Sequence, residues 1–411
     1  MLAILAAPSA PQHHVWDSSS PPQAIRVDDV PGVVTRKVVA FQCSKVNSGP
    51  LDHDASSKRT VAQAIARLLG CDFVDGVDQV PATPGQGSGE AWAEGARYLV
   101  PTQTLTTDEA QRWGITRPEH LFGGVVPHPF VATKVISHPL VEPLAPAPPG
   151  WSPAHGSRIR DAVLPGYSVF SAEDARAAAG RLLAGGSVRL KDPAGVGGLG
   201  QWVIQSLDDL ESHLADWSDD QLARHGLVLE RNLREVSTLS VGQVMVGDQV
   251  AAYVGTQGLT LNHVGHEVYG GSQLEVCRGG FDALLQERLQ PNVRRAVEQA
   301  LQFHQAALDC FPGFFASRCN YDIAQGLDDH GQMLSGVLEQ SWRIGGASGA
   351  EAVALQAFAG DPSLRRVRAS TTEVYADEVV PPPGAWVLYD GPDGHGRRLV
   401  KYARVELDVD A

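Results

Sequence analysis

The chain has 411 residues, which is enough for two or three domains with substantial cores. Its formal net charge is −14, and no run of Lys and Arg is interleaved with aromatic residues, so we expect no nucleic-acid partner. No apolar run is long enough to span a bilayer, and the short apolar opening lacks the basic segment of a signal peptide, so we expect no membrane partner.

The cysteine pattern indicates a reducing environment. The count is odd, and no two cysteines have the CxxC spacing of a zinc or redox site. Both observations argue against a disulfide framework, so we expect a cytoplasmic protein. The five residues are Cys43, Cys71, Cys277, Cys310 and Cys319.

The first third of the chain divides into a tail and a small domain. Residues 1–32 are rich in Pro, Ser and Ala and have no periodic pattern, so we expect a disordered tail. The elements predicted after it are strands at 38–41, 71–74 and 98–101 and helices at 58–69 and 107–113. This alternation of strands and helices favours a small α/β domain that ends near residue 130.

The rest of the chain follows a Pro-rich connector at 139–153. A helix is predicted from Ser171, with Asp174 at its third position, and a second capped helix starts at Ser206. Residues 263–272 are rich in glycine and polar side chains, so we expect a loop there. The other elements expected are strands at 188–191, 201–204 and 227–230, a hairpin of 238–246 with 249–253, and helices at 288–309 and 351–359.

A glycine loop lies between two of these strands. Gly195, Gly197 and Gly200 match the dinucleotide fingerprint by letter, but the next residues predict a strand, whereas the fingerprint must open a helix. A flexible glycine loop can still lie over phosphates and donate backbone N–H groups to them. Lys191 at its entry would add a positive charge. The alternative is an ordinary mobile hairpin.

Two later segments, 317–323 and 337–344, carry polar side chains at every second position. Successive strand side chains point to opposite faces, so the polar residues of each segment share one face. Turn formers lie between the segments, and we expect an antiparallel hairpin folded about the His330–Gly331 bond. This register places Asp322 opposite Glu339, Asn320 opposite Ser341 and Arg318 opposite Arg343, and it leaves Tyr321, Ile323, Trp342 and Ile344 to pack on the other face.

The facing carboxylates have a physical consequence. Two opposed carboxylates repel each other unless a positive group lies between them. Mg²⁺ is suited to that position, with phosphates and waters completing its ligands. Neighbouring arginines suit phosphate or carboxylate groups. The alternative is a hairpin with a solvated polar face.

In this order, the units resemble the ATP-grasp superfamily over residues 130–360. The segments VATKVISHPL, NYDIAQG and VLEQSWRIGGASGAE are similar to an uncharacterised bacterial family of ATP-grasp-like proteins. The resemblance implies an α/β fold of two α+β lobes after a small α/β domain. The implied parts are the tail at 1–32, the pre-ATP-grasp domain at 33–130, the N-lobe with the glycine hairpin at 131–229, the C-lobe with the metal hairpin at 230–375 and a C-terminal extension at 376–411.

The resemblance also implies roles for particular residues. ATP and Mg²⁺ are the implied cofactors. Ser341 takes the third metal-ligand position, where the family pattern has Asn, and a hydroxyl is a poorer neutral donor than an amide carbonyl. The implied nucleotide-binding residues are Lys134 and Lys191 for the phosphates, Gly197, Gly198 and Gly200 for the covering loop, Glu230 for the adenine and Glu235 for the ribose. The implied metal ligands are Asp322, Glu339 and Ser341, and the implied catalytic residues are Arg343 and Lys191.

Members of this superfamily that are ligases phosphorylate a carboxylate and then let an amine or thiol attack the acyl phosphate. The resemblance therefore implies a small-molecule carboxylate and a nucleophilic co-substrate as partners, and a homo-oligomer is compatible with it. Two alternatives stay open. One is a catalytically degenerate nucleotide-binding protein with a regulatory or scaffolding role, which the Ser341 departure favours. The other is a small-molecule kinase.

Candidate substrate contacts lie on the metal hairpin and upstream of it. On the hairpin these are Arg318 and Asn320, although a structural salt bridge, with Glu351 as one possible partner, is an equal alternative for Arg318. His263 and His266 have the i, i+3 spacing of a metal pair, but the glycines around them argue against a helix, and solvated loop histidines are the default. The upstream candidates are His263, Tyr269 and Ser272.

Overall fold

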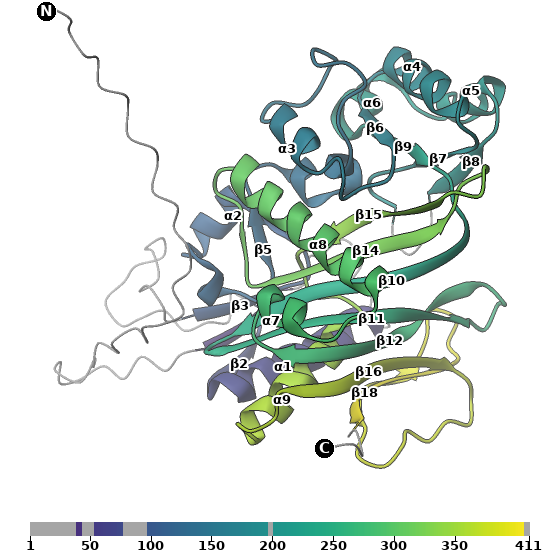
Figure 1. Ribbon diagram of the computed structural model, residues 1–411. Coiled ribbons are helices and arrows are strands. Elements are labelled where there is room, and N and C mark those ends of the chain that lie inside the picture. The colour runs from purple at the N-terminus through teal and green to yellow at the C-terminus, as the bar shows by residue number, and fades with distance from the viewer. Residues whose placement is uncertain (1–37, 43–52, 77–96, 196–199, 407–411) are drawn as a thin grey trace, which may run out of the picture. The chain divides into compact units, whose positions relative to one another are not determined.

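The computed structural model describes residues 38–42, 53–76, 97–195 and 200–406 (Figure 1). The expected tail at 1–32 lies outside the described residues, and so do Cys43, Gly197 and Gly198. The fold class is α/β, with both helices and sheets, as the sequence predicts.

The N-terminal part is a parallel sheet in the order β2-β1-β3. Its elements are β1 (Val38–Gln42), α1 (His53–Leu69), β2 (Asp72–Asp75) and β3 (Arg97–Pro101), and α1 begins five residues before the predicted helix. A second small sheet, in the order β13-β5-β4, joins this part to a strand far along the chain. Its elements are β4 (Leu105–Thr106), α2 (Thr107–Arg112), β5 (Gly124–Val126) and β13 (Phe315–Ala316).

Short helical turns connect this part to the next sheet. They are η2 (Pro118–His120), η3 (Pro129–Ala132), η4 (Lys134–Ser137) and α3 (Pro153–Arg158). The sheet that follows is antiparallel in the order β6-β9-β7-β8, with β6 (Gly166–Val169), β7 (Val188–Lys191), β8 (Gln201–Ile204) and β9 (Leu227–Arg231).

Three capped helices pack on the sheet of β6 to β9. The hydroxyls of Ser171, Ser206 and Ser218 accept hydrogen bonds from backbone N–H groups of the first turns, which satisfies donors that a helix start leaves free. Small and aliphatic side chains of the helices and strands form their common core. The helices are α4 (Ala172–Leu183), α5 (Leu207–Leu214) and α6 (Asp219–His225).

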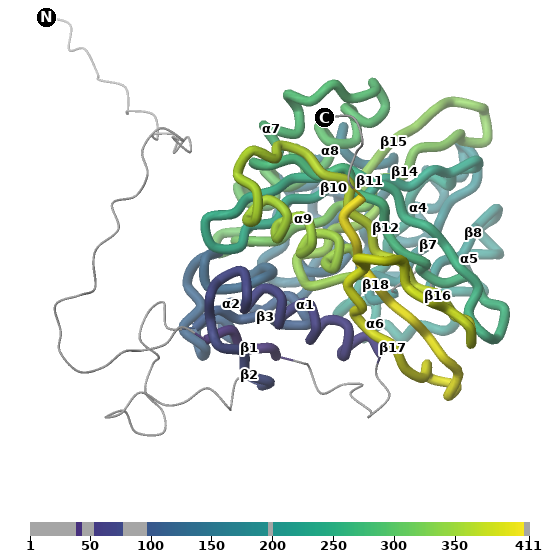
Figure 2. Tube along the Cα trace, turned by 90° about the horizontal axis from the view of Figure 1, so that it is seen from below, coloured from purple at the N-terminus to yellow at the C-terminus, as the bar shows by residue number. Residues whose placement is uncertain are grey.

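The largest sheet has eight strands in the order β15-β14-β10-β11-β12-β16-β18-β17. The strands are β10 (Arg234–Val246), β11 (Gln249–Leu261), β12 (Glu267–Arg278), β14 (Arg318–Leu327), β15 (Met333–Ser341), β16 (Arg366–Tyr375), β17 (Trp386–Pro392) and β18 (Arg398–Glu406). Helices α7 (Phe281–Gln286) and α8 (Pro291–Cys310) pack on one face (Figure 1). On the other face, α9 (Ser348–Gly360) packs against β16 and β18 and contacts α1 (Figure 2).

This sheet corrects one prediction and refines another. The expected loop at 263–272 is wrong from residue 267 onward, because β11 and β12 pair from Ala251 with Arg278 to Leu261 with Glu267 and leave only a short turn at 262–266. Glycines in that stretch hide the alternation that marks a strand. The division into domains stays a proposal. Glu230 and Arg231, which the prediction assigns to the C-lobe from residue 230, pair within the sheet of β6 to β9.

The hairpin of β14 and β15 has the predicted register where the polar residues lie. Asp322 pairs with Glu339, and Asn320 pairs with Ser341. Nearer the turn the register shifts by one residue, so that Leu327 pairs with Met333, and a bulge at Leu338 absorbs the difference. β15 ends at Ser341, so the predicted pairing of Arg318 with Arg343 is wrong.

β15 packs closely on the residues that precede β6, and a substitution at Gly336 can test this packing. A Cβ atom on Gly336 would overlap the backbone of Val163 and Leu164, whereas one on Gly180, inside α4, would meet nothing within 4 Å. We predict that Gly336→Ala lowers the free energy of unfolding by about 1–3 kcal/mol. Gly180→Ala should raise it by about 0.5–1 kcal/mol. Urea unfolding measures both, and equal effects of the two substitutions would contradict this packing.

Candidate functional site

The centre of the site is the pair of facing carboxylates on β14 and β15. Asp322 Oδ1 accepts hydrogen bonds from Ser240 Oγ at 2.9 Å, Gln257 Nε2 at 2.8 Å and Asn320 Nδ2 at 2.9 Å. Burial raises the pKa of Asp322, and the neighbouring charge of Glu339 raises it further. Asp322 and Glu339 thus face each other across the hairpin, and their role as metal ligands stays a prediction.

Lys134 connects this pair to the glycine loop. It starts η4, where the Thr133 hydroxyl caps the turn, and its side chain is buried. Its ammonium lies 3.0 Å from Glu339 Oε2 and donates to the carbonyl of Gly195 at 2.7 Å. One predicted phosphate-binding lysine is thus in contact with one predicted metal ligand and with the start of the loop.

A second charged cluster fixes Lys191 at the end of β7. Its ammonium lies 2.6 Å from Glu230 Oε1, and His138 Nε2 lies 3.0 Å from Glu230 Oε2. All three side chains are at most 2% exposed. Burial raises the pKa of Glu230, but the charge of Lys191 and the contact with His138 outweigh it and lower the pKa to about 2.

Sequence reasoning missed His138. It lies in the segment VATKVISHPL, four residues after Lys134, and it has no charge pattern that sets it apart. Its ring packs against Gly166, where a Cβ atom would overlap the ring, and its Nδ1 atom is buried without a hydrogen-bond partner in the described part of the chain. Only the fold brings it to Glu230.

Arg343 is the second residue after the end of β15 and is partly buried. Its guanidinium donates to the carbonyl of Ile344 at 3.2 Å, and no described carboxylate lies within ion-pair distance of it. Burial and the charge of Arg318 lower its pKa, while Asp54 and Glu339 act in the opposite direction. A partly buried guanidinium with donors that no described carboxylate occupies is suited to an anionic group.

Arg318 has a structural partner. Its guanidinium lies 2.7 Å from Glu351 Oε1, and both side chains are at most 2% exposed. The same guanidinium donates to the Ser341 Oγ atom at 3.3 Å and to the carbonyl of Arg343 at 2.7 Å. Of the two alternatives that the sequence leaves open for Arg318, the structure shows the salt bridge.

The remaining predicted residues are more scattered. The Tyr269 hydroxyl bonds with Ser272 Oγ at 2.6 Å and with Thr371 Oγ1 at 3.1 Å, and burial raises its pKa, with Glu373 and Asp322 adding to the increase. His263 contacts the carbonyl of Arg398 at 2.9 Å in the turn after β11. Glu235 is exposed at a bulge of β10 and has a positive φ of 52°.

Gly200 is the one predicted residue of the covering loop within the described residues. Its φ is +69°, which glycine adopts without strain, and its carbonyl accepts from the N–H of Asp192 at 2.8 Å. This bond closes the base of the loop beside Lys191. The other two glycines, Gly197 and Gly198, lie outside the described residues.

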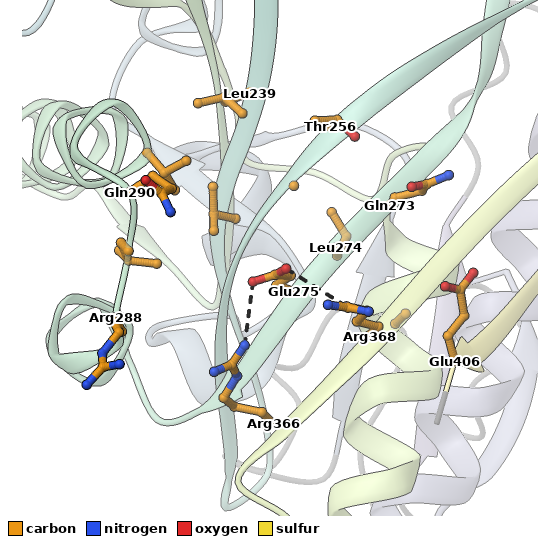
Figure 3. A pocket seen from close by; sticks show the side chains of 15 residues that line it. Leu239, Thr256, Gln273, Leu274, Glu275, Arg288, Gln290, Arg366, Arg368 and Glu406 are labelled. Atoms are coloured by element: carbon orange, nitrogen blue, oxygen red, sulfur yellow. Dashed lines mark ion pairs between the residues drawn. The ribbon is translucent and has the colours of Figure 1, made fainter. Parts of the chain in front are cut away.

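One cavity lies outside this site. It has a volume of about 490 Å³ and is lined by Leu239 of β10 and Thr256 of β11, among others (Figure 3). The next residues along these strands, Ser240 and Gln257, bond to Asp322. Because successive strand side chains alternate, the cavity and the acid pair lie on opposite faces of the sheet.

Other kinds of site receive little support within the described ranges. No group of three His, Cys, Asp or Glu side chains comes together there. Within the described residues Cys277, Cys310 and Cys319 are free thiols, and none of the described helices is both long and apolar enough to cross a membrane.

Residues 41–403 match the family described as "Protein of unknown function (DUF3182)", and the chain belongs to this family. No curated protein matches the sequence. The chain has the ATP-grasp fold that its motifs predict. The biotin carboxylase domain of Hydrogenobacter thermophilus 2-oxoglutarate carboxylase, solved with MgADP, ADP and bicarbonate, is 13% identical with a TM-score of 0.51, and the match covers 90% of this chain and 86% of that one.

Two other solved structures are similar at lower TM-scores. Staphylococcus aureus N5-carboxyaminoimidazole synthetase is 11% identical with a TM-score of 0.46, covering 91% of this chain and 94% of that one. Thermotoga maritima phosphoribosylamine–glycine ligase is 13% identical with a TM-score of 0.46, covering 89% and 91%. At these identities the likeness concerns the fold alone.

The Glu230 cluster gives a pH prediction. The pKa of Glu230 in the folded chain, about 2, lies below its ordinary value of 4.5, so the stability it contributes is present above about pH 4.5 and is lost as the pH falls through about 2. We predict that the gap in unfolding free energy between the wild type and Glu230→Gln narrows from about pH 5 to about pH 3. Urea unfolding at several pH values measures this gap.

The exposed Glu298 on α8 provides the matched control, because Glu298→Gln removes a carboxyl of the same kind from the surface. Its gap from the wild type should stay close to zero over the same range. A gap for Glu230→Gln that is constant with pH would contradict the charged cluster.

Proposed function

We propose that this protein is a Mg²⁺- and ATP-dependent ligase that joins a carboxylate to an amine or a thiol through an acyl phosphate. The observation that carries the proposal is the contact of Lys134 with both Glu339 and the glycine loop, beside the facing carboxylate of Asp322. A bound triphosphate requires positive charge beside its phosphates, and a lysine together with a divalent cation held by two carboxylates would supply it.

The donor set fits Mg²⁺. Hard divalent cations prefer carboxylate and carbonyl oxygens, and the facing pair supplies two carboxylates that burial and mutual repulsion make ready to accept a positive charge. When bound, the cation would neutralise charge on the phosphates as they react. Asp322 and Glu339 would hold it, with Ser240 and Gln257 orienting the Asp322 carboxylate.

The two lysines and the arginine would bind and orient the nucleotide phosphates and the substrate through their positions and charges. Lys191, fixed by Glu230, would contact the nucleotide phosphates under the glycine loop, and Lys134 would exchange its contact with Glu339 for a phosphate oxygen. Arg343 would bind the substrate carboxylate or the phosphoryl group on it. Most of the rate enhancement in phosphoryl transfer comes from such positioning and charge stabilisation.

The reaction then proceeds in two transfers. A carboxylate oxygen attacks the terminal phosphorus of ATP, which forms the acyl phosphate and releases ADP. An amine or thiol next attacks the acyl carbon, phosphate leaves, and the nucleophile gives up its proton. Both transfers use groups that the substrates supply, so no nucleophilic side chain is needed.

One observation favours a second candidate, a nucleotide-binding protein without catalysis. The Ser341 hydroxyl accepts a hydrogen bond from Arg318, which weakens it as a metal ligand. We also keep the proposal that the protein is a kinase that stops at the phosphorylated substrate. Product analysis separates the kinase from the ligase, because only the ligase consumes a second substrate.

We predict that Glu339→Gln lowers Mg²⁺-dependent ADP release, measured with a panel of carboxylates and amines, by about two orders of magnitude. The amide keeps the shape of the side chain but removes the charge that would hold the cation. Glu298→Gln is the control and should leave the rate unchanged. Equal rates for the wild type and Glu339→Gln would sink the metal assignment, and a wild type that binds ADP but never turns over ATP would support the second candidate.

A further inference from the structure

Asp322 and Glu339 supply two carboxylate ligands to the proposed metal site, and the third ligand should be a neutral oxygen. The structure points to the residue that supplies this oxygen. Ser341 occupies the position expected for that ligand, and its partner in the β14–β15 ladder is Asn320. The amide is therefore at the same level of the hairpin, on the neighbouring strand. This inference rests on the proposed function, since it concerns the cation of that site.

Ser341 is already engaged. Arg318 Nη1 donates to the Ser341 Oγ atom at 3.3 Å and to the Ser341 carbonyl at 3.2 Å. The guanidinium is held in place by Glu351, and both are buried. A cation on Ser341 Oγ would have to share that oxygen with a fixed positive charge, which disfavours binding there.

Asn320 lies on the other side of the same network. Its Nδ2 atom donates to Asp322 Oδ1 at 2.9 Å, and its Oδ1 atom is 2.9 Å from the Tyr253 hydroxyl. That hydroxyl also lies 2.6 Å from Glu351 Oε1. A phenol has one proton, so it can donate to Asn320 or to Glu351, but not to both.

A half-turn of the Asn320 amide, which exchanges the positions of its Oδ1 and Nδ2 atoms, removes this competition for the Tyr253 proton. The phenol then donates to Glu351, a carboxylate that can only accept, and Asn320 Nδ2 donates to the phenol oxygen. The same half-turn places Asn320 Oδ1 about 2.9 Å from Asp322 Oδ1. Two oxygens at that distance repel each other unless a proton or a cation lies between them.

The distance itself suits Mg²⁺. Its ligands are octahedral at about 2.0–2.1 Å, so neighbouring ligand oxygens are about 2.9 Å apart. After the half-turn of the amide, the side-chain oxygens of Asn320 and Asp322 would have the separation that adjacent ligand positions of such an ion require. Asp322 is kept in place by Ser240 and Gln257, and Asn320 by Tyr253, so neither needs the backbone to move.

We propose that the Asn320 amide oxygen, together with the carboxylates of Asp322 and Glu339, holds the divalent cation, and that Ser341 instead supports Arg318. The departure from the family pattern at Ser341 is thus compensated on the facing strand. The network of Tyr253, Glu351 and Arg318 positions the Asn320 amide. In this scheme the network has no contact with the substrate.

The test uses Mn²⁺ as the probe, with its binding to the full chain in the presence of ADP followed by electron paramagnetic resonance. The wild type should bind Mn²⁺, and Glu339→Gln should lose this binding. Asn320→Leu, which keeps the shape but removes the oxygen, should weaken Mn²⁺ binding about tenfold or more. Asn320→Asp keeps the oxygen and should bind at least as tightly as the wild type. Ser341→Ala should change the affinity less than threefold.

The outcomes separate this proposal from the proposed function. If the wild type binds no Mn²⁺, the proposed function fails. If Glu339→Gln loses binding while Asn320→Leu keeps it and Ser341→Ala weakens it, the metal pair stands and the role of Asn320 is overturned. Should Asn320→Leu fold poorly, an anomalous-scattering map of the wild-type crystal with Mn²⁺ decides: an ion within bonding distance of Ser341 Oγ and not of Asn320 Oδ1 overturns the proposal.

Discussion

The architecture of the site depends on the repulsion between two carboxylates that paired strands hold face to face. Asp322 lies on a strand that is bonded on both sides, to β10 and to β15, so it cannot move away from Glu339 without breaking a ladder. Burial and the like charge both raise its pKa. Such a pair is unfavourable by itself and becomes favourable when a cation lies between the two groups. Positive charge lies beside the pair, because the Lys134 ammonium is 3.0 Å from Glu339 Oε2.

Two lysines relate this pair to the rest of the molecule. Lys134 reaches Glu339 from a turn that precedes the sheet of β6 to β9, and it also holds the carbonyl of Gly195. Lys191 is fixed on that sheet by the buried carboxylate of Glu230. Lys134 is therefore in contact with Glu339 of the eight-stranded sheet and with the residue that starts the glycine loop, while Lys191 is fixed within the sheet of β6 to β9. A nucleotide that entered between them would meet charges whose positions are already set.

The sequence predicts the pairing of Asp322 with Glu339, because polar alternation and turn formers determine the register of a hairpin locally. It does not reveal the bulge at Leu338, since one extra residue leaves no mark in the composition, nor the strand β12, where glycines hide the alternation. It also does not reveal His138 or the partners of Asn320. Those contacts join segments that are distant in the chain, and only the fold shows which polar atoms compete for one proton.

The most direct test of the central claim is the titration of Asp322, followed by carbon nuclear magnetic resonance with labelled aspartate carboxyl groups and assigned with Asp322→Asn. The claim predicts a pKa above the ordinary value of 3.8 in metal-free protein and a clear decrease when ADP and Mg²⁺ are added, because the cation relieves the repulsion from Glu339. An Asp322 pKa that Mg²⁺ leaves unchanged would contradict the claim that the facing carboxylates form the metal site.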